Sequence, residues 1–110
     1  MKSLASVFVC LLLATNLAHA QGVGSSGDIA GTVTDSSGAF LPKVTVSVVD
    51  TQTGLKRTAV TDGAGQYRVA GLSPSTYEVS AGLAGFATEL RKAVPIAVGQ
   101  TVVSDFRMKP

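Results

Sequence analysis

The chain has 110 residues and a formal net charge of +2, with one cysteine, one histidine and no tryptophan. This length allows one domain with a single hydrophobic core. The near-neutral charge, with Lys and Arg dispersed along the chain, excludes the nucleic-acid-binding proteins that depend on a basic stripe.

The beginning of the chain has the pattern of a secretory signal peptide covering residues 1–20. Lys2 supplies a positive start, and residues 4–14 form an apolar run. Ala18 and Ala20 form a small-x-small site before Gln21. We therefore expect cleavage after Ala20 and export to the periplasm, the outer membrane or the extracellular medium. The apolar run is roughly half of the 20 residues that a membrane-spanning helix needs, so no such helix is expected after cleavage.

Cleavage would remove Cys10 and His19, the one cysteine and the one histidine. The mature chain then has no thiol chemistry and no Ser–His or Cys–His catalytic pair. These features predict a protein that is not an enzyme and needs no cofactor. The remaining carboxylates are spread singly along the sequence: Asp28, Asp35, Asp50, Asp62, Glu78, Glu89 and Asp105.

The mature chain divides into a Gly/Ser-rich leader, residues 21–27, and a domain, residues 28–108. Within the domain, apolar and polar residues alternate in short segments bounded by Gly, Pro, Asp and Ser, which is typical of half-buried strands. Residues 86–90 are a candidate for a further short strand. About seven strands at this spacing, with no helical period, predict an antiparallel β-sandwich. The expected strands are residues 29–33, 44–48, 55–61, 66–70, 76–81, 94–98 and 101–108.

The predicted core contains two tyrosines, Tyr67 and Tyr77, each near the start of an expected strand. Large buried aromatic rings contribute more apolar area than any other side chain, so we expect the loss of either ring to destabilise the fold strongly. Gly31 is expected to allow the facing sheet to approach closely. The predicted core residues are Val33, Val44, Val46, Val48, Tyr67, Val69, Leu72, Tyr77, Val79, Phe86 and Phe106.

Two segments have the features of edge strands. Lys56 and Arg57 suit an edge that must not pair with other chains. Pro95 lacks an N–H and restricts its segment to an edge or to irregular structure. An extended segment of a partner could add to either edge. The alternative is that the charges only keep the edge soluble.

Several short motifs follow one another along the domain: residues 31–38 (GTVTDSSG), Leu41-Pro42, Thr61-Asp62, Gly65-Gln66-Tyr67, Gly71-Leu72, Thr76-Tyr77 and Gly85-Phe86. As an ordered set they resemble the carboxypeptidase regulatory-like domain over residues 28–108. The resemblance implies a seven-stranded antiparallel sandwich of the transthyretin-like (prealbumin-like) type. Two positions depart from the usual family pattern, since Lys43 and Ser75 each replace a glycine of a turn, and at Ser75 we expect a type I turn.

The resemblance implies an accessory module rather than a catalytic one. Such domains occur behind metallocarboxypeptidase domains, in tandem on secreted or surface proteins, and ahead of the plug and barrel of TonB-dependent outer-membrane receptors. The signal peptide, short leader and single domain look most like the last arrangement. The chain is then either a small exported protein or the front of a larger receptor.

The ligand could be of three kinds: a metal ion, a carbohydrate or a protein. Asp35 and Asp62 open turns that could supply oxygen ligands to Ca²⁺, but their role in Asx turns explains them equally well, so no metal site is predicted. The fold group includes starch-binding-like domains, which implies a carbohydrate-binding alternative. Phe40 is the one aromatic residue expected in a loop, and it is the candidate contact to such a ligand. The leading interpretation is binding of a protein partner in the cell envelope.

Overall fold

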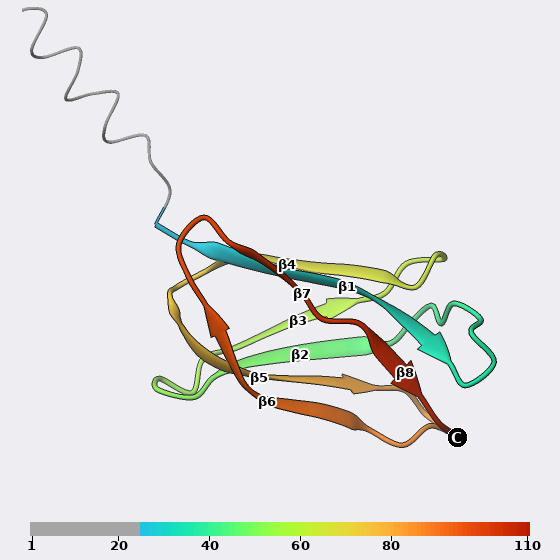
Figure 1. Cartoon of the computed structure of the whole chain (residues 1–110). Helices are drawn as coiled ribbons and strands as arrows, with labels where there is room; N and C mark the ends of the chain where they lie inside the picture. The colour runs from blue at the N-terminus through green and yellow to red at the C-terminus, as the bar shows by residue number, and fades with distance from the viewer. Residues whose placement is uncertain (1–24) are drawn as a thin grey trace, which may run out of the picture.

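The computed structural model describes residues 25–110. The predicted cleavage residues Ala18, Ala20 and Gln21 lie outside this range. In the described part the structure is all-β, and its two four-stranded sheets pack face to face (Figure 1). The β-sandwich inferred from the alternating pattern is therefore confirmed. The strands are β1 (Gly27–Asp35), β2 (Thr45–Asp50), β3 (Lys56–Val60), β4 (Gln66–Leu72), β5 (Ser75–Gly82), β6 (Glu89–Ile96), β7 (Thr101–Val103) and β8 (Phe106–Met108).

The first sheet is built around β1, which pairs with β4 on one side and with β7 and then β8 on the other. The pairing of β1 with β4 is antiparallel, but its pairings with β7 and β8 are parallel, which differs from the wholly antiparallel sheet that we expected. The cause is that the chain crosses from the second sheet to the first after β6. Asp28 donates its N–H to the Gln100 carbonyl, and Gly99 donates to Ser26, so the chain joins the first sheet where β1 begins and must run alongside it.

The segment 101–108 was expected to be one strand, but it is interrupted between β7 and β8. At the interruption, Ser104 donates its backbone N–H to the Ala30 carbonyl, and the Asp105 carboxylate accepts the Thr32 N–H at 2.8 Å. A side-chain oxygen thus takes the place of a backbone carbonyl in the ladder. A Cβ on Gly31 would lie 2.1 Å from the Ser104 carbonyl oxygen. The close approach that requires glycine here therefore comes from the same sheet, and not from the facing one as we expected.

The second sheet has the order β3-β2-β5-β6, and all of its pairings are antiparallel. Its edges are β3, which contains Lys56 and Arg57, and β6, which contains Pro95. Both segments with edge features in the sequence thus lie at edges of this sheet. The expected short strand at 86–90 is not formed as such, because β6 begins at Glu89.

The core lies between the two sheets, and the inward face of each strand carries its alternate apolar residues. All of the predicted core residues are buried except Phe86, which is only partly buried against the cluster. Phe86 belongs to the connection between β5 and β6, where its N–H donates to the Leu83 carbonyl. A residue in a connection covers the end of the core instead of being enclosed by both sheets, which explains the difference.

Each buried tyrosine has a partner for its hydroxyl group. Tyr67 donates to the backbone carbonyl of Ser104, and Tyr77 donates to that of Ser73 at 2.5 Å. Burial raises the pKa of Tyr67 to about 12, and it also raises the pKa of Tyr77. The two rings therefore fill the core with their apolar bodies while their polar ends hold neighbouring backbone in place.

Candidate functional site

The sandwich has two open sides, where the edges of its two sheets lie next to each other (Figure 1). On one side β3 of the second sheet lies beside β4 of the first. On the other side β6 lies beside β8 and contacts β1. A partner that binds to backbone groups must approach one of these sides, because the faces of a sheet present only side chains.

The β3 edge is a regular strand with free backbone groups. Its register with β2 is continuous from Lys56 to Val60. The Leu55 carbonyl accepts the Asp50 N–H, and the Thr61 N–H donates to the Val44 carbonyl. In an antiparallel ladder, backbone groups alternate between the partner strand and the opposite side. The N–H and C=O groups of Lys56, Thr58 and Val60 therefore point away from β2, towards the open edge.

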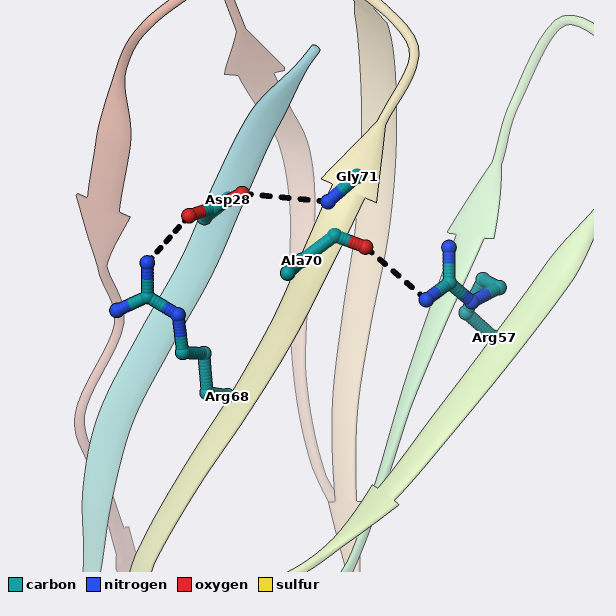
Figure 2. A network of polar contacts seen from close by, with 5 residues as sticks. All are labelled: Asp28, Arg57, Arg68, Ala70 and Gly71. Atoms are coloured by element: carbon teal, nitrogen blue, oxygen red, sulfur yellow. Dashed lines mark hydrogen bonds and ion pairs between the residues drawn. The ribbon is translucent and has the colours of Figure 1, made fainter.

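Arginine side chains connect the strands on this side of the molecule. Arg57 of β3 donates to the carbonyl of Ala70 in β4 at 3.0 Å, and so joins the two sheets (Figure 2). Within the first sheet, Arg68 of β4 forms an ion pair with Asp28 of β1, and the other Asp28 oxygen accepts the Gly71 N–H at 3.2 Å. The Arg57 contact holds β4 close to β3, and none of these hydrogen bonds involves the free backbone groups of Lys56, Thr58 and Val60.

Two surface concavities flank this seam. The larger, an open groove of about 640 Å³, is lined by Ala59 and Val60 of β3, by residues 66–68 of β4, and by residues 30–32 of β1. The smaller, of about 240 Å³, lies at the other end of β3 and is lined by Leu55, Arg57 and Leu72 among others. Both concavities therefore lie on the β3–β4 side.

The opposite side is irregular. The register between β5 and β6 shifts between Tyr77 and Val79, and Ala93 on β6 has a φ of 56°, in the left-handed region. Pro95 removes a further N–H from this edge. Arg91 donates to the Asp105 carbonyl, and its guanidinium lies 4.8 Å from the centre of the Phe106 ring. A bulge, a proline and an interrupted neighbour leave little continuous backbone for a partner.

Phe40, the predicted ligand contact, is 59% exposed and lies in the loop between β1 and β2, bridged to Thr34. It lines neither concavity. The rings of Tyr67, Tyr77 and Phe106 are buried. The part of the chain that the structure describes thus offers no paired aromatic surface on which a sugar ring could stack.

The carboxylates of Asp35 and Asp62 are engaged in their own turns. Asp35 accepts the Ser37 hydroxyl at 2.6 Å and the backbone N–H groups of Ser37 and Ala39. The Ser37 hydroxyl is the main cause that lowers the pKa of Asp35. Asp62 accepts the N–H groups of Ala64 and Gln66. Among residues 25–110, no three His, Cys, Asp or Glu side chains come together as metal ligands.

Lys43, where the family pattern has glycine, has a φ of 63°. The backbone of this turn thus keeps the conformation that glycine favours, although a lysine occupies it. At the other departure, Ser75 begins β5 and has no positive φ. The hydroxyl of Ser75 donates to the Asp50 carboxylate at 2.8 Å, so this serine ties the β4–β5 turn to the end of β2.

The sequence indicated the two edge segments but not the grooves beside one of them. Grooves form where strands distant in the sequence lie together, as β1, β3 and β4 do here. The exposed apolar residues next to the basic pair were the available signal. Leu55 precedes β3 and Val60 ends it, and they are 71% and 61% exposed.

No helix of the described residues has the length and apolar character to cross a membrane. No curated protein sequence is significantly similar to the chain. Among solved structures, the fold is similar to a Bacteroides uniformis protein that is proposed to bind carbohydrate, with a TM-score of 0.62 and 21% identity over 77% of this chain and 42% of the other. It is also similar to GBS52, the minor pilin of Streptococcus agalactiae, with a TM-score of 0.61 and 16% identity over 79% and 45% of the two chains.

Chlorocatechol 1,2-dioxygenase from Pseudomonas putida has a similar fold too, with a TM-score of 0.59 and 15% identity over 78% of this chain and 61% of the enzyme. The chain thus spans less than two thirds of each of these proteins, and at these identities the similarity shows a common fold alone. A family relationship comes from the sequence. The pattern of the carboxypeptidase regulatory-like domain matches residues 28–109. This match covers most of the chain and nearly all of the sandwich, so the chain belongs to the carboxypeptidase regulatory-like domain family.

Proposed function

We propose that this protein is an exported, non-enzymatic accessory module that binds a protein partner in the cell envelope through the β3–β4 side of its sandwich. Membership of a regulatory-like domain family and a fold shared with a pilin both support an interaction role. The single observation that carries the proposal is the asymmetry of the open sides. The β3 edge is continuous and lies between two concavities, while the β6 edge is bulged and contains Pro95.

Export to the periplasm, the outer membrane or the medium is part of the proposal. It rests on the signal-peptide pattern of residues 1–20. Within this setting we favour the type of domain that precedes the plug of TonB-dependent receptors, and a small exported protein is the other arrangement.

Site-specific photo-crosslinking in exporting cells tests the proposal. A photoreactive phenylalanine derivative is placed at Val60 on β3 or, as a matched control, at Leu90 on β6, since both are exposed apolar residues of edge strands. We expect the Val60 probe to crosslink to a discrete envelope protein and the Leu90 probe not to. Retention of the chain in the cytoplasm, or equal crosslinking from both positions, would contradict the proposal.

Carbohydrate binding is a second candidate function. The larger groove has polar side chains on its walls, including Asp62, Gln66 and Arg68, and the Bacteroides uniformis protein with this fold is proposed to bind carbohydrate. If a sugar binds there, Arg68→Ala should weaken retention in polysaccharide affinity electrophoresis. If it binds the exposed loop ring, Phe40→Ala should do so instead. Unretarded migration of the unaltered protein on a panel of glucans and envelope glycans would reject this candidate.

A further inference from the structure

The β3 edge presents a short, regular row of unpaired backbone groups. The register with β2 directs the N–H and C=O of Lys56, Thr58 and Val60 outwards. No hydrogen bond within residues 25–110 occupies these groups. A strand added here would form a continuous antiparallel or parallel ladder and would extend the second sheet.

The side chains around this row differ from those of an edge protected against pairing. Protected edges carry charges, prolines or bulges along their length, and β6 has all three. On β3 the basic pair occupies only the first two positions, while Thr58, Ala59 and Val60 are uncharged. Both ends of the strand adjoin concavities that contain the exposed apolar residues Leu55 and Val60.

Charge indicates what the added strand must carry. The ion pair between Arg68 and Asp28 is the one salt bridge among the described residues, so neither Lys56 nor Arg57 has a carboxylate partner there. Glu78, on the same face as Lys56, is separated from it by Val49 of the intervening strand β2. A carboxylate on an added strand would lie directly opposite or diagonal to Lys56, at the distance where cross-strand pairs interact.

We propose that β3 receives an extended segment of a protein partner by strand addition. The segment has an acidic residue next to Lys56 and uncharged β-branched or apolar residues along Thr58 and Val60. Side chains of the segment that point to the inner face enter the seam between β3 and β4, where the concavities lie. This inference rests on the proposed function and specifies how its partner binds. A second copy of the chain fits less well, because its own β3 contains no acidic residue that could pair with Lys56.

The probe is a library of random 12-residue peptides displayed on phage and selected against the purified protein. We expect enriched peptides to alternate β-branched or apolar with polar residues and to contain an acidic residue near one end. In amide hydrogen exchange followed by NMR, binding of an enriched peptide should slow exchange at Lys56, Thr58 and Val60 at least tenfold. The amides of Arg57 and Ala59, which point towards β2, should change little.

Matched variants separate strand addition from nonspecific attraction. Lys56→Glu should weaken binding of the enriched peptide tenfold or more, whereas Lys92→Glu, an identical charge change at an exposed position of β6, should leave it unchanged. Thr58→Pro should abolish binding, since it removes an outward N–H. N-methylation of the peptide at alternate residues provides the same test without altering the protein. Methyl groups on the residues whose N–H faces β3 should abolish binding, and methyl groups on the alternate residues should not.

Four results would overturn the inference. The first three are the absence of any enriched peptide, protection that maps to residues other than those of β3, and equal weakening by Lys56→Glu and Lys92→Glu. A concentration-dependent dimer with the same protected amides would also overturn it and would assign the edge to a second copy. If crosslinking from Val60 captures an envelope protein while the peptide selection fails, the proposed function stands and only strand addition is rejected.

Discussion

The two open sides of the sandwich are bridged by similar arginine contacts, but their strands differ in regularity. On each side one arginine of the second sheet donates to a backbone carbonyl of the first, Arg57 to Ala70 and Arg91 to Asp105. Around Arg57 the strands are regular and concavities lie beside them, whereas around Arg91 one strand is bulged and its neighbour is interrupted. Each side therefore has one arginine bridge between the sheets, and the two sides differ in the regularity of their strands.

The strongest test of this comparison removes the ring that supports the smaller concavity on the β3–β4 side. Tyr77→Ala should lower the free energy of unfolding by about 3–5 kcal/mol, the usual range for deletion of a large buried aromatic ring. Tyr77→Phe keeps the ring and loses only the hydrogen bond to Ser73, so it should cost about 1 kcal/mol. Urea unfolding measures both values. Equal, small effects of the two variants would show that the ring does not support this side.

Removing each bridging arginine compares the two sides directly. Arg91→Ala should cost about 1–2 kcal/mol, because Arg91 loses both a hydrogen bond and its contact with the Phe106 ring. Arg57→Ala loses one exposed hydrogen bond and should cost about 0.5–1 kcal/mol. Urea unfolding of both variants provides the measurement. The reverse order would mean that the β3–β4 side depends more on its bridge than the irregular side does.

A glycine substitution on each side should relieve backbone strain. Lys43, whose N–H donates to Thr61 just after β3, and Ala93 on β6 have φ values of 63° and 56°. Lys43→Gly and Ala93→Gly should each stabilise the fold by up to about 1 kcal/mol, because glycine adopts positive φ without steric cost. Thermal unfolding measures the gain. Lys43→Ala, which keeps the Cβ, is the control and should show none.

The smallest expected effect depends on pH and concerns the turn that leads into β3. The N–H of Gln52 is the first cause that lowers the pKa of Asp50 below its ordinary value of 3.8, and the Ser75 hydroxyl is the second. A carboxylate with a lowered folded-state pKa stabilises the fold above pH 3.8, and this contribution is lost as the pH falls through the lowered value.

Asp50→Asn should therefore lower the urea midpoint at pH 7. The difference from the unaltered protein should shrink as the pH falls below 3.8 and through the lowered pKa of Asp50. Glu89→Gln, a loss of charge at the far edge strand, is the control. A difference that persists unchanged at pH 2 would indicate that Asp50 acts through its shape and not through its charge.

The alternation of side chains explains why much of the fold could be predicted from the sequence. The pattern of Val44, Val46 and Val48 is compatible with a single orientation of β2, and a basic pair or a proline restricts a strand to an edge. The direction of β7 and β8 could not be predicted in this way, because alternation is the same in parallel and antiparallel strands. It depends on the hydrogen bonds that tie residues 99–100 to the beginning of β1.

The candidate site was predictable only in part, because it also depends on contacts between strands that are distant in the sequence. Lys56 and Arg57 indicated an edge, but nothing local to β3 indicates that β4 and β1 border a groove beside it. Conversely, Phe40 was predicted as a ligand contact because it lies in a loop, and its distance from both grooves depends on how the loop packs. Phe86 was assigned to the core as the start of a possible short strand at 86–90, but it lies in the connection before β6, which begins at Glu89.

The parallel alignment of β1 with β7 and β8 also determines how the domain would respond to tension. The chain enters β1 at one end of the sandwich and leaves β8 at the other (Figure 1). A force that pulls the two ends apart would slide these strands past each other, so their hydrogen bonds would have to rupture together instead of opening one by one. Under mechanical load, such a domain would resist stretching most strongly along its own length.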